Sequence, residues 1–360
     1  MVNRLPQDPR TPVMAQPPRP LLVIYTGGTL GMLPSASGLA PGGDFERRLA
    51  AALASLPPAR RADLPRFELI ETPQPIDSSA ATPATWRVLA GLIAAQHAEQ
   101  RYAGVVVLHG TDTLAWSAAS LAYQLQGIDM PVVVTGAMLP LEAEGSDALG
   151  NIEAALRFAA EPGLREVAIC FAGRLLRATR ARKWHTQAAD AFTSPNYPPL
   201  GELVDQRPIL YPSRGLAEQQ RGAPRFELPD YPGISPVVRI ALWPGIAAWQ
   251  LAAWLEPAAV QGALLEVWGG GNVPDDPALL GVLARASGEG KLLAALSQCP
   301  HGGIDIGHYA AGQGLADAGV LCADDMTPEA VMTKLVHLLA QPLDDAERRR
   351  RFLTPLAGER

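Results

Sequence analysis

The chain has 360 residues, of which 48% are hydrophobic and 18% charged, and its formal net charge at pH 7 is −6. This length allows one large domain or two ordinary ones, and the composition is that of a globular protein rather than a disordered or fibrous one. The acidic balance argues against a nucleic-acid partner, which normally requires a basic surface.

The cysteines and the apolar segments bear on the cellular compartment. Cys170, Cys299 and Cys322 are scattered without a CxxC spacing, so the sequence predicts neither a disulfide framework nor a zinc site. Residues 1–19 are rich in proline and lack the apolar core of a secretory signal. The longest apolar stretch, 240–255, is interrupted by Pro and Gln and is shorter than a membrane span. We therefore expect a cytoplasmic protein with no membrane partner.

Short runs rich in Val, Ile and Leu alternate with longer amphipathic stretches in the first half of the chain. The runs predict strands at 21–26, 67–71, 104–109, 131–135 and 166–171. The longer stretches predict helices at 44–55, 83–100, 113–126 and 147–160. Thr82 and Pro83 supply an N-cap and a first residue for the second of these helices. Apolar strands separated by helices indicate an α/β fold with a parallel sheet covered on both faces.

A less regular stretch from about 205 to 233, rich in Pro, Gly and Arg, looks like a linker. Beyond it the alternation of apolar runs and helical segments resumes. The sequence therefore predicts two α/β domains, a larger N-terminal one with a parallel sheet and a smaller C-terminal one. The predicted boundaries are a flexible arm at 1–19, the first domain at 20–212, the linker at 213–233 and the second domain at 234–360.

Two of the apolar runs end in loops of the same kind. "LLVIYTGGTLGML" at 21–33 leads into Thr-Gly-Gly-Thr, and "VVVLHGTDTLAW" at 105–116 leads into Gly-Thr-Asp-Thr. Ligands of open parallel sheets bind beyond the carboxyl ends of the strands, where Thr26, Thr29, Thr111 and Asp112 are expected. Glycines let backbone N–H groups approach such a ligand closely. Two similar loops therefore indicate a site.

Other interpretations of the two loops remain open. "TGGTLG" matches neither GxGxxG nor GxxxxGK[ST], which disfavours a nucleotide site. Gly27 and Gly28 are also compatible with a plain turn before a helix capped by Thr29. The second loop has more polar groups than a cap requires, and threonine hydroxyls become nucleophiles only beside a base or a cation.

Lys183, in "RATRARKWHT", is a candidate for that cation. It is one of three lysines among the 30 basic residues, so the chain uses arginine almost everywhere else. An ammonium group can take part in proton transfer, whereas a guanidinium group stays charged. A solvated basic loop is the alternative interpretation of this segment.

Six motifs occur in the order found in a known family: "YTGGTLGM", "PIDSSAATPATW", "VVVLHGTDTLAWSA", "VVVTGAMLPL", "RARKWHTQAADAFTSPNYPPL" and "LSQCPHGG". On these motifs the chain resembles the bacterial L-asparaginases, most closely their cytoplasmic type I branch, from about residue 20 to about residue 350. The resemblance implies a two-domain α/β amidohydrolase that uses neither a metal nor an organic cofactor. It also implies a homodimer or homotetramer.

The resemblance implies catalytic roles for four residues. Thr29 matches the family's nucleophile, which attacks the side-chain amide of L-asparagine, releases ammonia and leaves an acyl-enzyme that water hydrolyses. Thr111 would lie against the substrate amide beside Lys183, and Asp112 would pair with the substrate's α-ammonium group. A cation beside the hydroxyl would keep it reactive.

The remaining matched positions would bind substrate. Asp77 and Ser78, in "DSS", would hold the α-ammonium and α-carboxylate groups. Gly110 belongs to the same substrate-binding set, and Ala137, in "TGAM", would offer its carbonyl to the amide NH2.

The chain departs from the family pattern at a catalytic position. The family carries a tyrosine on the loop after the first motif, where it deprotonates or orients the nucleophile, and the corresponding residue here is Leu39. Loss of such an acid–base group typically costs about 10²–10⁴ in rate. If nothing replaces it, turnover would be slow; if Tyr25 or another subunit's residue replaces it, activity would be normal.

A second departure concerns regulation. Type I members can bind asparagine at a second, allosteric site. Cys299 is retained there, but Glu266 occupies the place of an arginine expected shortly before "WGGGN". We therefore expect weak or no allostery.

Three alternatives to an asparaginase remain. Glutamine is one methylene longer, and such a difference gives only about 1–3 kcal/mol of discrimination, so a glutaminase-asparaginase is possible. The amidase half of a tRNA amidotransferase is disfavoured by the absence of an extra RNA-binding domain or basic surface. A catalytically weak or silent relative could instead bind and sense an amino acid, although it would gain little from keeping Thr29 and Lys183.

Overall fold

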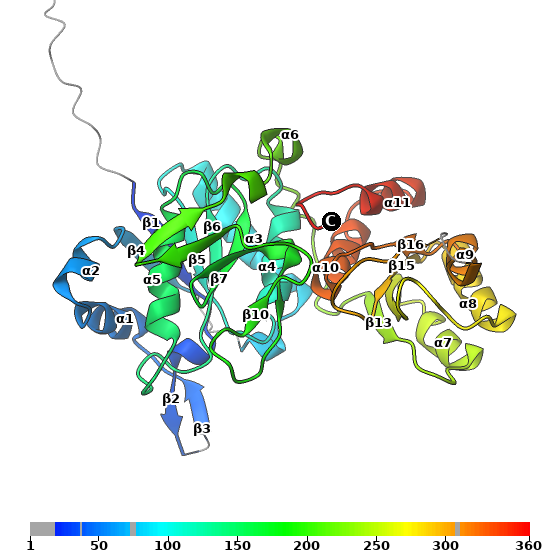
Figure 1. The fold of residues 1–360 in the computed structure, drawn as a ribbon, viewed down its shortest axis with the longest axis horizontal. Helices are drawn as coiled ribbons and strands as arrows, with labels where there is room; N and C mark the ends of the chain where they lie inside the picture. Colours follow the sequence, from blue (N-terminus) through cyan, green and yellow to red (C-terminus); the bar gives the residue numbers. More distant parts are fainter. Residues whose placement is uncertain (1–18, 37, 73–76, 307–309) are drawn as a thin grey trace, which may run out of the picture.

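The computed structural model describes residues 19–36, 38–72, 77–306 and 310–360 (Figure 1). The predicted N-terminal arm lies outside these ranges except for Arg19. The two predicted groups of strands form two separate sheets, which lie side by side in Figure 1.

The larger sheet has eight strands in the order β12-β11-β8-β7-β6-β5-β1-β4. Its parallel part consists of β1 (Leu21–Tyr25), β4 (Phe67–Glu71), β5 (Val105–Leu108), β6 (Val132–Thr135) and β7 (Val167–Phe171). These are the five strands predicted from the sequence. An antiparallel extension follows, formed by β8 (Arg174–Arg177), β11 (Gly201–Val204) and β12 (Arg207–Leu210). The start of the predicted linker-like stretch is therefore an edge strand.

Helices cover both faces of this sheet because successive residues of a buried strand point to opposite sides. Leu22 and Ile24 face the layer of α3 (Pro83–Ala98) and α4 (Leu114–Gln124). Leu21 and Val23 face α1 (Phe45–Ala54) and α5 (Ala148–Ala159). The four predicted helices are confirmed, and α2 (Pro58–Ala62) was not predicted.

The remaining elements of this half are short. They are the hairpin β2 (Met32–Ser35) and β3 (Gly38–Pro41), the pair β9 (Arg182–Lys183) and β10 (Phe192–Thr193), α6 (Glu218–Arg221), and the 3-10 turns η1 (Thr29–Gly31), η2 (Ser78–Ala80), η3 (Ala178–Arg180) and η4 (Pro212–Arg214). The β2–β3 hairpin projects from the body at the bottom of Figure 1.

The second half is a smaller α/β unit. Its parallel sheet contains β13 (Val237–Ala241), β14 (Gly262–Val267), β15 (Leu292–Ser297) and β16 (Leu321–Cys322). Its helices are α7 (Ala248–Leu255), α8 (Pro277–Gly288), α9 (Ala310–Asp317), α10 (Pro328–Leu339) and α11 (Asp345–Leu353). Helix α10 packs on β14 and also against α4, so it joins the two halves. No helix in the described ranges has the length and apolar character that crossing a membrane requires.

A polar cluster around Glu227 fastens the connecting segment to the second half. The carboxylate accepts hydrogen bonds from His337 Nε2 at 3.1 Å, Gln341 Nε2 at 3.0 Å and Arg351 Nη2 at 2.7 Å. Burial works to raise the pKa of Glu227, but these donors prevail and lower it to about 2.

The Glu227 cluster predicts a pH-dependent contribution to stability. Because the pKa in the folded protein is depressed, the carboxylate stabilises the fold above about pH 4.5 and loses that effect as pH falls toward about 2. We expect Glu227→Gln to lower the free energy of unfolding by about 2–3 kcal/mol at pH 7 and by much less near pH 2. Urea unfolding at both pH values measures this difference. Glu256→Gln, at an exposed position, is the control, and an equal loss at both pH values in Glu227→Gln would contradict the prediction.

Candidate active site

The two threonine loops meet at the carboxyl edge of the larger sheet. Strands β1 and β5 are neighbours, with Tyr25 opposite Leu108, so their following loops start side by side. Gly28 has a φ of 95°, and a Cβ built on it would lie 2.4 Å from the Cα of Gly110. Only glycine permits this backbone contact. The glycines of both motifs therefore serve close packing of the two loops.

The first loop is anchored by Thr26 and presents Thr29. Thr26 is buried, and both its backbone N–H (3.0 Å) and its hydroxyl (2.9 Å) donate to Leu108 O. Its hydroxyl therefore fixes the loop, contrary to the expectation that it faces a ligand. Thr29 is the half-buried first residue of η1, with Gly28 in the N-cap position. The interpretation of Thr29 as a helix N-cap is thus wrong.

Lys183 reaches the second loop from a distant part of the sequence. Its Nζ donates to Thr111 Oγ1 at 2.9 Å and to Asp112 Oδ1 at 2.8 Å. The Lys183 side chain is 21% exposed, and β9 holds it through pairing of Lys183 with Phe192 in β10. The alternative of a solvated basic loop is therefore wrong for this residue.

The contact with Lys183 determines how the Thr111 hydroxyl is oriented. Because the Thr111 oxygen accepts from an ammonium group, its own hydrogen points elsewhere and is free to be donated or removed. Thr111 also lies just before α4, whose N-terminal end carries partial positive charge. Both features favour negative charge developing at this point.

The Asp77–Ser78 turn packs against the second loop. Thr113 Oγ1 donates to Ser78 O at 2.7 Å, and a Cβ on Gly110 would lie 2.5 Å from Ser78 Oγ. Ser78 is buried, whereas Asp77 is exposed and accepts a hydrogen bond from Ser79 N at 3.0 Å. The structure thus brings both residues to the edge where Thr111 lies.

The loop that contains Ala137 is held by two residues that the sequence analysis did not identify. Asp147 Oδ1 accepts from the backbone N–H groups of Met138 and Leu139, both at 3.0 Å. Asn151 Nδ2 donates to Gly136 O at 3.0 Å, so the peptide groups on both sides of Ala137 are fixed. A Cβ on Gly136 would lie 3.4 Å from Thr111 Cγ2, which places this loop beside the second motif. An acidic residue at the start of the helix predicted at 147–160 was the available signal, but such a residue is also an ordinary helix cap.

His109 holds the backbone of the second threonine loop in place. The imidazole is fully buried, and this burial lowers its pKa, so the ring is neutral at pH 7. Its Nδ1 contacts Gly110 O at 2.7 Å, which requires Nδ1–H to donate, and Nε2 then accepts from Ser117 Oγ at 3.0 Å. His109 fixes the Gly110 carbonyl and is itself held by α4.

The structure also shows where Leu39 and Tyr25 lie. Leu39 is 51% exposed on β3, opposite Pro34, in the projecting hairpin. Tyr25 is buried and stacks on Phe45 with a centroid distance of 3.9 Å, and a Cβ on Gly31 would lie 1.8 Å from its hydroxyl oxygen. Burial raises the pKa of the Tyr25 hydroxyl to about 12. Tyr25 therefore packs against η1 as a core residue and is a poor replacement for the acid–base role of the loop tyrosine.

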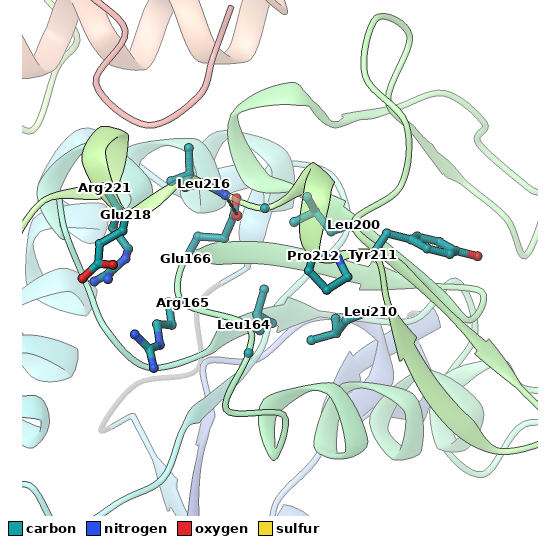
Figure 2. A pocket seen from close by; sticks show the side chains of 12 residues that line it. Leu164, Arg165, Glu166, Leu200, Leu210, Tyr211, Pro212, Leu216, Glu218 and Arg221 are labelled. Atoms are coloured by element: carbon teal, nitrogen blue, oxygen red, sulfur yellow. Dashed lines mark hydrogen bonds between the residues drawn. The ribbon is translucent and has the colours of Figure 1, made fainter.

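A well-formed cavity elsewhere contains none of these residues. It has a volume of about 260 Å³ and is lined by Glu166, Arg221 and several leucines (Figure 2). Glu166 lies just before β7 begins, at the opposite edge of the parallel sheet from the two threonine loops. Its carboxylate is already bound to Arg177 and to the Leu216 N–H.

The fold is that of a two-domain α/β protein whose polar loops meet at the carboxyl edge of the larger sheet. Residues 20–214 match the family description "Asparaginase, N-terminal", and residues 236–352 match "Glutaminase/Asparaginase C-terminal domain". The chain therefore belongs to the asparaginase family.

Individual relatives include members of the type I branch. L-asparaginase 1 of Escherichia coli K12 is 38% identical over 341 residues, covering 94% of this chain and 97% of that protein. The crystal structure of L-asparaginase I from Vibrio cholerae has a TM-score of 0.83 at 36% identity and covers 95% of this chain and 99% of that one. One component of the glutamyl-tRNA(Gln) amidotransferase of Pyrococcus furiosus is 33% identical over 264 residues, covering 71% of this chain and 58% of that protein.

Proposed function

We propose that this protein hydrolyses L-asparagine to L-aspartate and ammonia through a threonine acyl-enzyme. The observation that carries the proposal is the contact of the Lys183 ammonium with both Thr111 Oγ1 and Asp112 Oδ1. A sensing protein needs groups that bind an amino acid, but it has no need of a cation directed at a hydroxyl group. Similarity to the asparaginases named above supports the same substrate.

In the proposed reaction, Thr29 Oγ attacks the side-chain amide carbon of asparagine and the amide nitrogen leaves as ammonia. The proton of the Thr29 hydroxyl passes to that nitrogen, and an ester with Thr29 remains. Water then attacks the ester, aspartate leaves and the hydroxyl group is restored. Backbone N–H groups of Thr29 and Thr111 stabilise the oxyanion, each contributing about 10²–10³ in rate.

The other residues hold the substrate. Asp112 and Asp77 supply carboxylates for the α-ammonium group, and charge-assisted bonds of this kind are stronger than neutral ones. Ser78 and the Gly110 backbone line the α-carboxylate side. The Ala137 carbonyl, in a loop fixed by Asp147 and Asn151, accepts from the substrate amide NH2.

Ammonia release from L-asparagine by the purified chain tests the proposal. Release above the rate in buffer supports it. Silence together with calorimetric binding of asparagine would instead favour the amino-acid sensor, and faster release from glutamine would favour a glutaminase-asparaginase. The partial similarity to the Pyrococcus furiosus protein supports the amidotransferase alternative, whereas the net charge of −6 disfavours an RNA partner.

The leucine at the family's tyrosine position predicts a gain of function. We expect Leu39→Tyr to raise kcat by about 10-fold or more, because it restores an acid–base group at an exposed position where the larger ring costs no packing. Steady-state ammonia release measures the change. Val204→Tyr, at a similarly exposed strand position, should leave kcat unaltered; an unaltered rate in Leu39→Tyr would mean that another group already acts as the base.

We expect the rate to depend hyperbolically on asparagine concentration. Glu266 is engaged by Arg239, with contacts of 3.1 Å and 2.7 Å between the guanidinium and the carboxylate. Because the Arg239 guanidinium is already paired with Glu266, it does not offer a free positive charge to the α-carboxylate of a second asparagine. A Hill coefficient near 1 in initial-rate measurements agrees with this expectation, and a strongly sigmoidal curve contradicts it.

We also propose that the protein is a cytoplasmic homo-oligomer. The boundary between its two domains is proposed to lie near residues 213–233. The family descriptions end at residue 214 and resume at residue 236, which supports this division. Trp243, Trp249 and Trp254 are exposed on and near α7, and aromatic residues are enriched in protein interfaces. These tryptophans are the surface on which a subunit contact is most expected.

A further inference from the structure

Segment 354–360 runs back from α11 into the space between the two halves of the molecule (Figure 1). A buried ion pair holds it there. Glu359 and Lys334 of α10 are both 0% exposed and are paired to each other. Lys334 Nζ also donates to Phe352 O at 2.7 Å and to Thr354 O at 2.8 Å, which completes its three hydrogen bonds.

The other oxygen of the Glu359 carboxylate closes the segment on itself. Glu359 Oε2 accepts from the backbone N–H of Leu356 at 3.0 Å and of Ala357 at 2.8 Å. A buried charge stays ionised in the interior only when it is paired and hydrogen-bonded in this way. The segment therefore has one specific folded shape rather than loose packing.

The backbone carbonyls of the segment point at the first half and bind η3. Thr179 Oγ1 donates to Ala357 O at 3.0 Å, and Arg180 Nη1 donates to Glu359 O at 2.7 Å. Arg180 also forms two contacts with the Asp325 carboxylate, at 2.6 Å and 2.7 Å. Thr179 and Arg180 are both buried, so these bonds are not replaced by water without local rearrangement.

The turn held in this way leads directly to the proposed catalytic lysine. Lys183 lies three positions after Arg180, in the two-residue strand β9. Helix α4, which begins immediately after the Thr111 loop, packs against both η3 and α10. Segment 354–360 thus contacts the element before Lys183, and that element packs on the helix that supports Thr111.

We propose that segment 354–360 is a positioning element for Lys183, and that the Lys334–Glu359 pair seats it. The proposal rests on the hydrolase activity proposed above, whose supporting observation is the contact of Lys183 Nζ with Thr111 Oγ1. The pairing of β9 with β10 involves only two residues in each strand, so docking of the segment on η3 adds a further constraint on the backbone that leads to Lys183. Misplacement of a catalytic group by about 1 Å can cost about 10²-fold in rate.

Removing one hydroxyl tests this without introducing a charge or a cavity. Thr179→Val keeps the shape of the side chain but loses the bond to Ala357 O, and we expect kcat to fall about 10-fold while KM changes less than about 2-fold. Thr179→Ser keeps a hydroxyl and should restore kcat to within about 2-fold of the unmutated chain. The matched control is Thr333→Val, since Thr333 is also 0% exposed but its hydroxyl bonds only to α10 carbonyls.

The kinetic outcomes distinguish positioning of Lys183 from general destabilisation. A loss of kcat in Thr179→Val with rescue by serine and none in Thr333→Val supports positioning. Equal losses of kcat in the two valine variants would overturn it, because they would reflect general destabilisation of the protein. Unaltered kcat in Thr179→Val would also overturn it. Glu359→Gln is the second variant, with the same expected loss; burial already lowers the pKa of Lys334 to about 8, so the amine can shed its proton when its partner is removed.

Hydrogen exchange decides the inference independently of activity. In Thr179→Val, amide exchange over 181–193 should be faster than in the unmutated chain, and exchange over 262–267 should be unaltered. Unaltered exchange over 181–193 in both Thr179→Val and Glu359→Gln would overturn the proposal. If the unmutated chain releases no ammonia, the proposed function fails, while the exchange result still shows whether the segment holds β9.

Discussion

Thr29→Ala is expected to reduce ammonia release from L-asparagine by at least about 10⁴-fold, the largest effect of any single substitution here. The alanine removes the only atom that forms the ester with substrate in the proposed reaction. Thr29 is half-buried at the start of a short turn and is not a strand or core residue, so its loss should not unfold the protein. Coupled ammonia detection measures the rate, and thermal unfolding checks that the variant is folded.

Substrate binding separates a chemical role of Thr29 from a structural one. Calorimetric binding of aspartate to Thr29→Ala should stay within about 3-fold of the unmutated chain, since Asp77, Ser78 and Asp112 remain in place. Thr29→Ser should keep measurable turnover because serine retains a hydroxyl group on the same Cβ atom. Thr29→Ala with more than about 1% of the original kcat would show that another residue is the nucleophile.

Regular parallel-sheet structure was the part most readily predicted from the sequence. Buried parallel strands are continuous apolar runs, and the helices between them carry a clear apolar face, so strand β5 and helix α4 stand out by composition alone. The antiparallel strands β8, β11 and β12 did not, because Arg, Glu or Pro interrupts each of these four-residue strands, so none is a continuous apolar run. The pair β9–β10 has two residues in each strand and leaves no periodic pattern at all.

The approach of the two threonine loops was predictable in outline but not in its contacts. Glycines after apolar runs indicated close backbone approach, and the structure places Gly28 against Gly110. Which hydroxyls face the ligand was not predictable, because Thr26 and Thr29 belong to the same motif but only neighbouring strands decide that Thr26 bonds to Leu108 O. The position of Tyr25 depended in the same way on packing, here against Phe45.

Long-range contacts explain what the sequence did not predict. Lys183 reaches Thr111 across 72 positions of sequence, and Ala357 O reaches Thr179 across 178. Neither pairing follows from local propensity or spacing. The resemblance to the asparaginases pointed to the first pairing because it carries residue roles, whereas the second required the folded coordinates.

Lys183→Met should lower kcat about 10³-fold or more, because it leaves Thr111 and Asp112 without the ammonium that contacts both. Methionine preserves much of the aliphatic length, so packing of β9 against β10 is retained. Lys183→Arg should recover little activity, because a planar guanidinium does not reproduce two contacts from a single nitrogen at 2.9 Å and 2.8 Å. The guanidinium also stays charged, so it does not take part in proton transfer.

Lys291→Met supplies the matched control for the lysine. Lys291 is also largely buried, and its Nζ donates to Pro257 O at 3.1 Å and Val260 O at 2.7 Å, within the second half of the chain. Its loss should lower the unfolding temperature and leave kcat within about 2-fold, because no proposed catalytic residue depends on it. If Lys183→Arg matches the unmutated rate, Lys183 acts only through its charge. If Lys291→Met lowers kcat as much as Lys183→Met, the loss of rate comes from removing a buried lysine and not from losing the contact with Thr111.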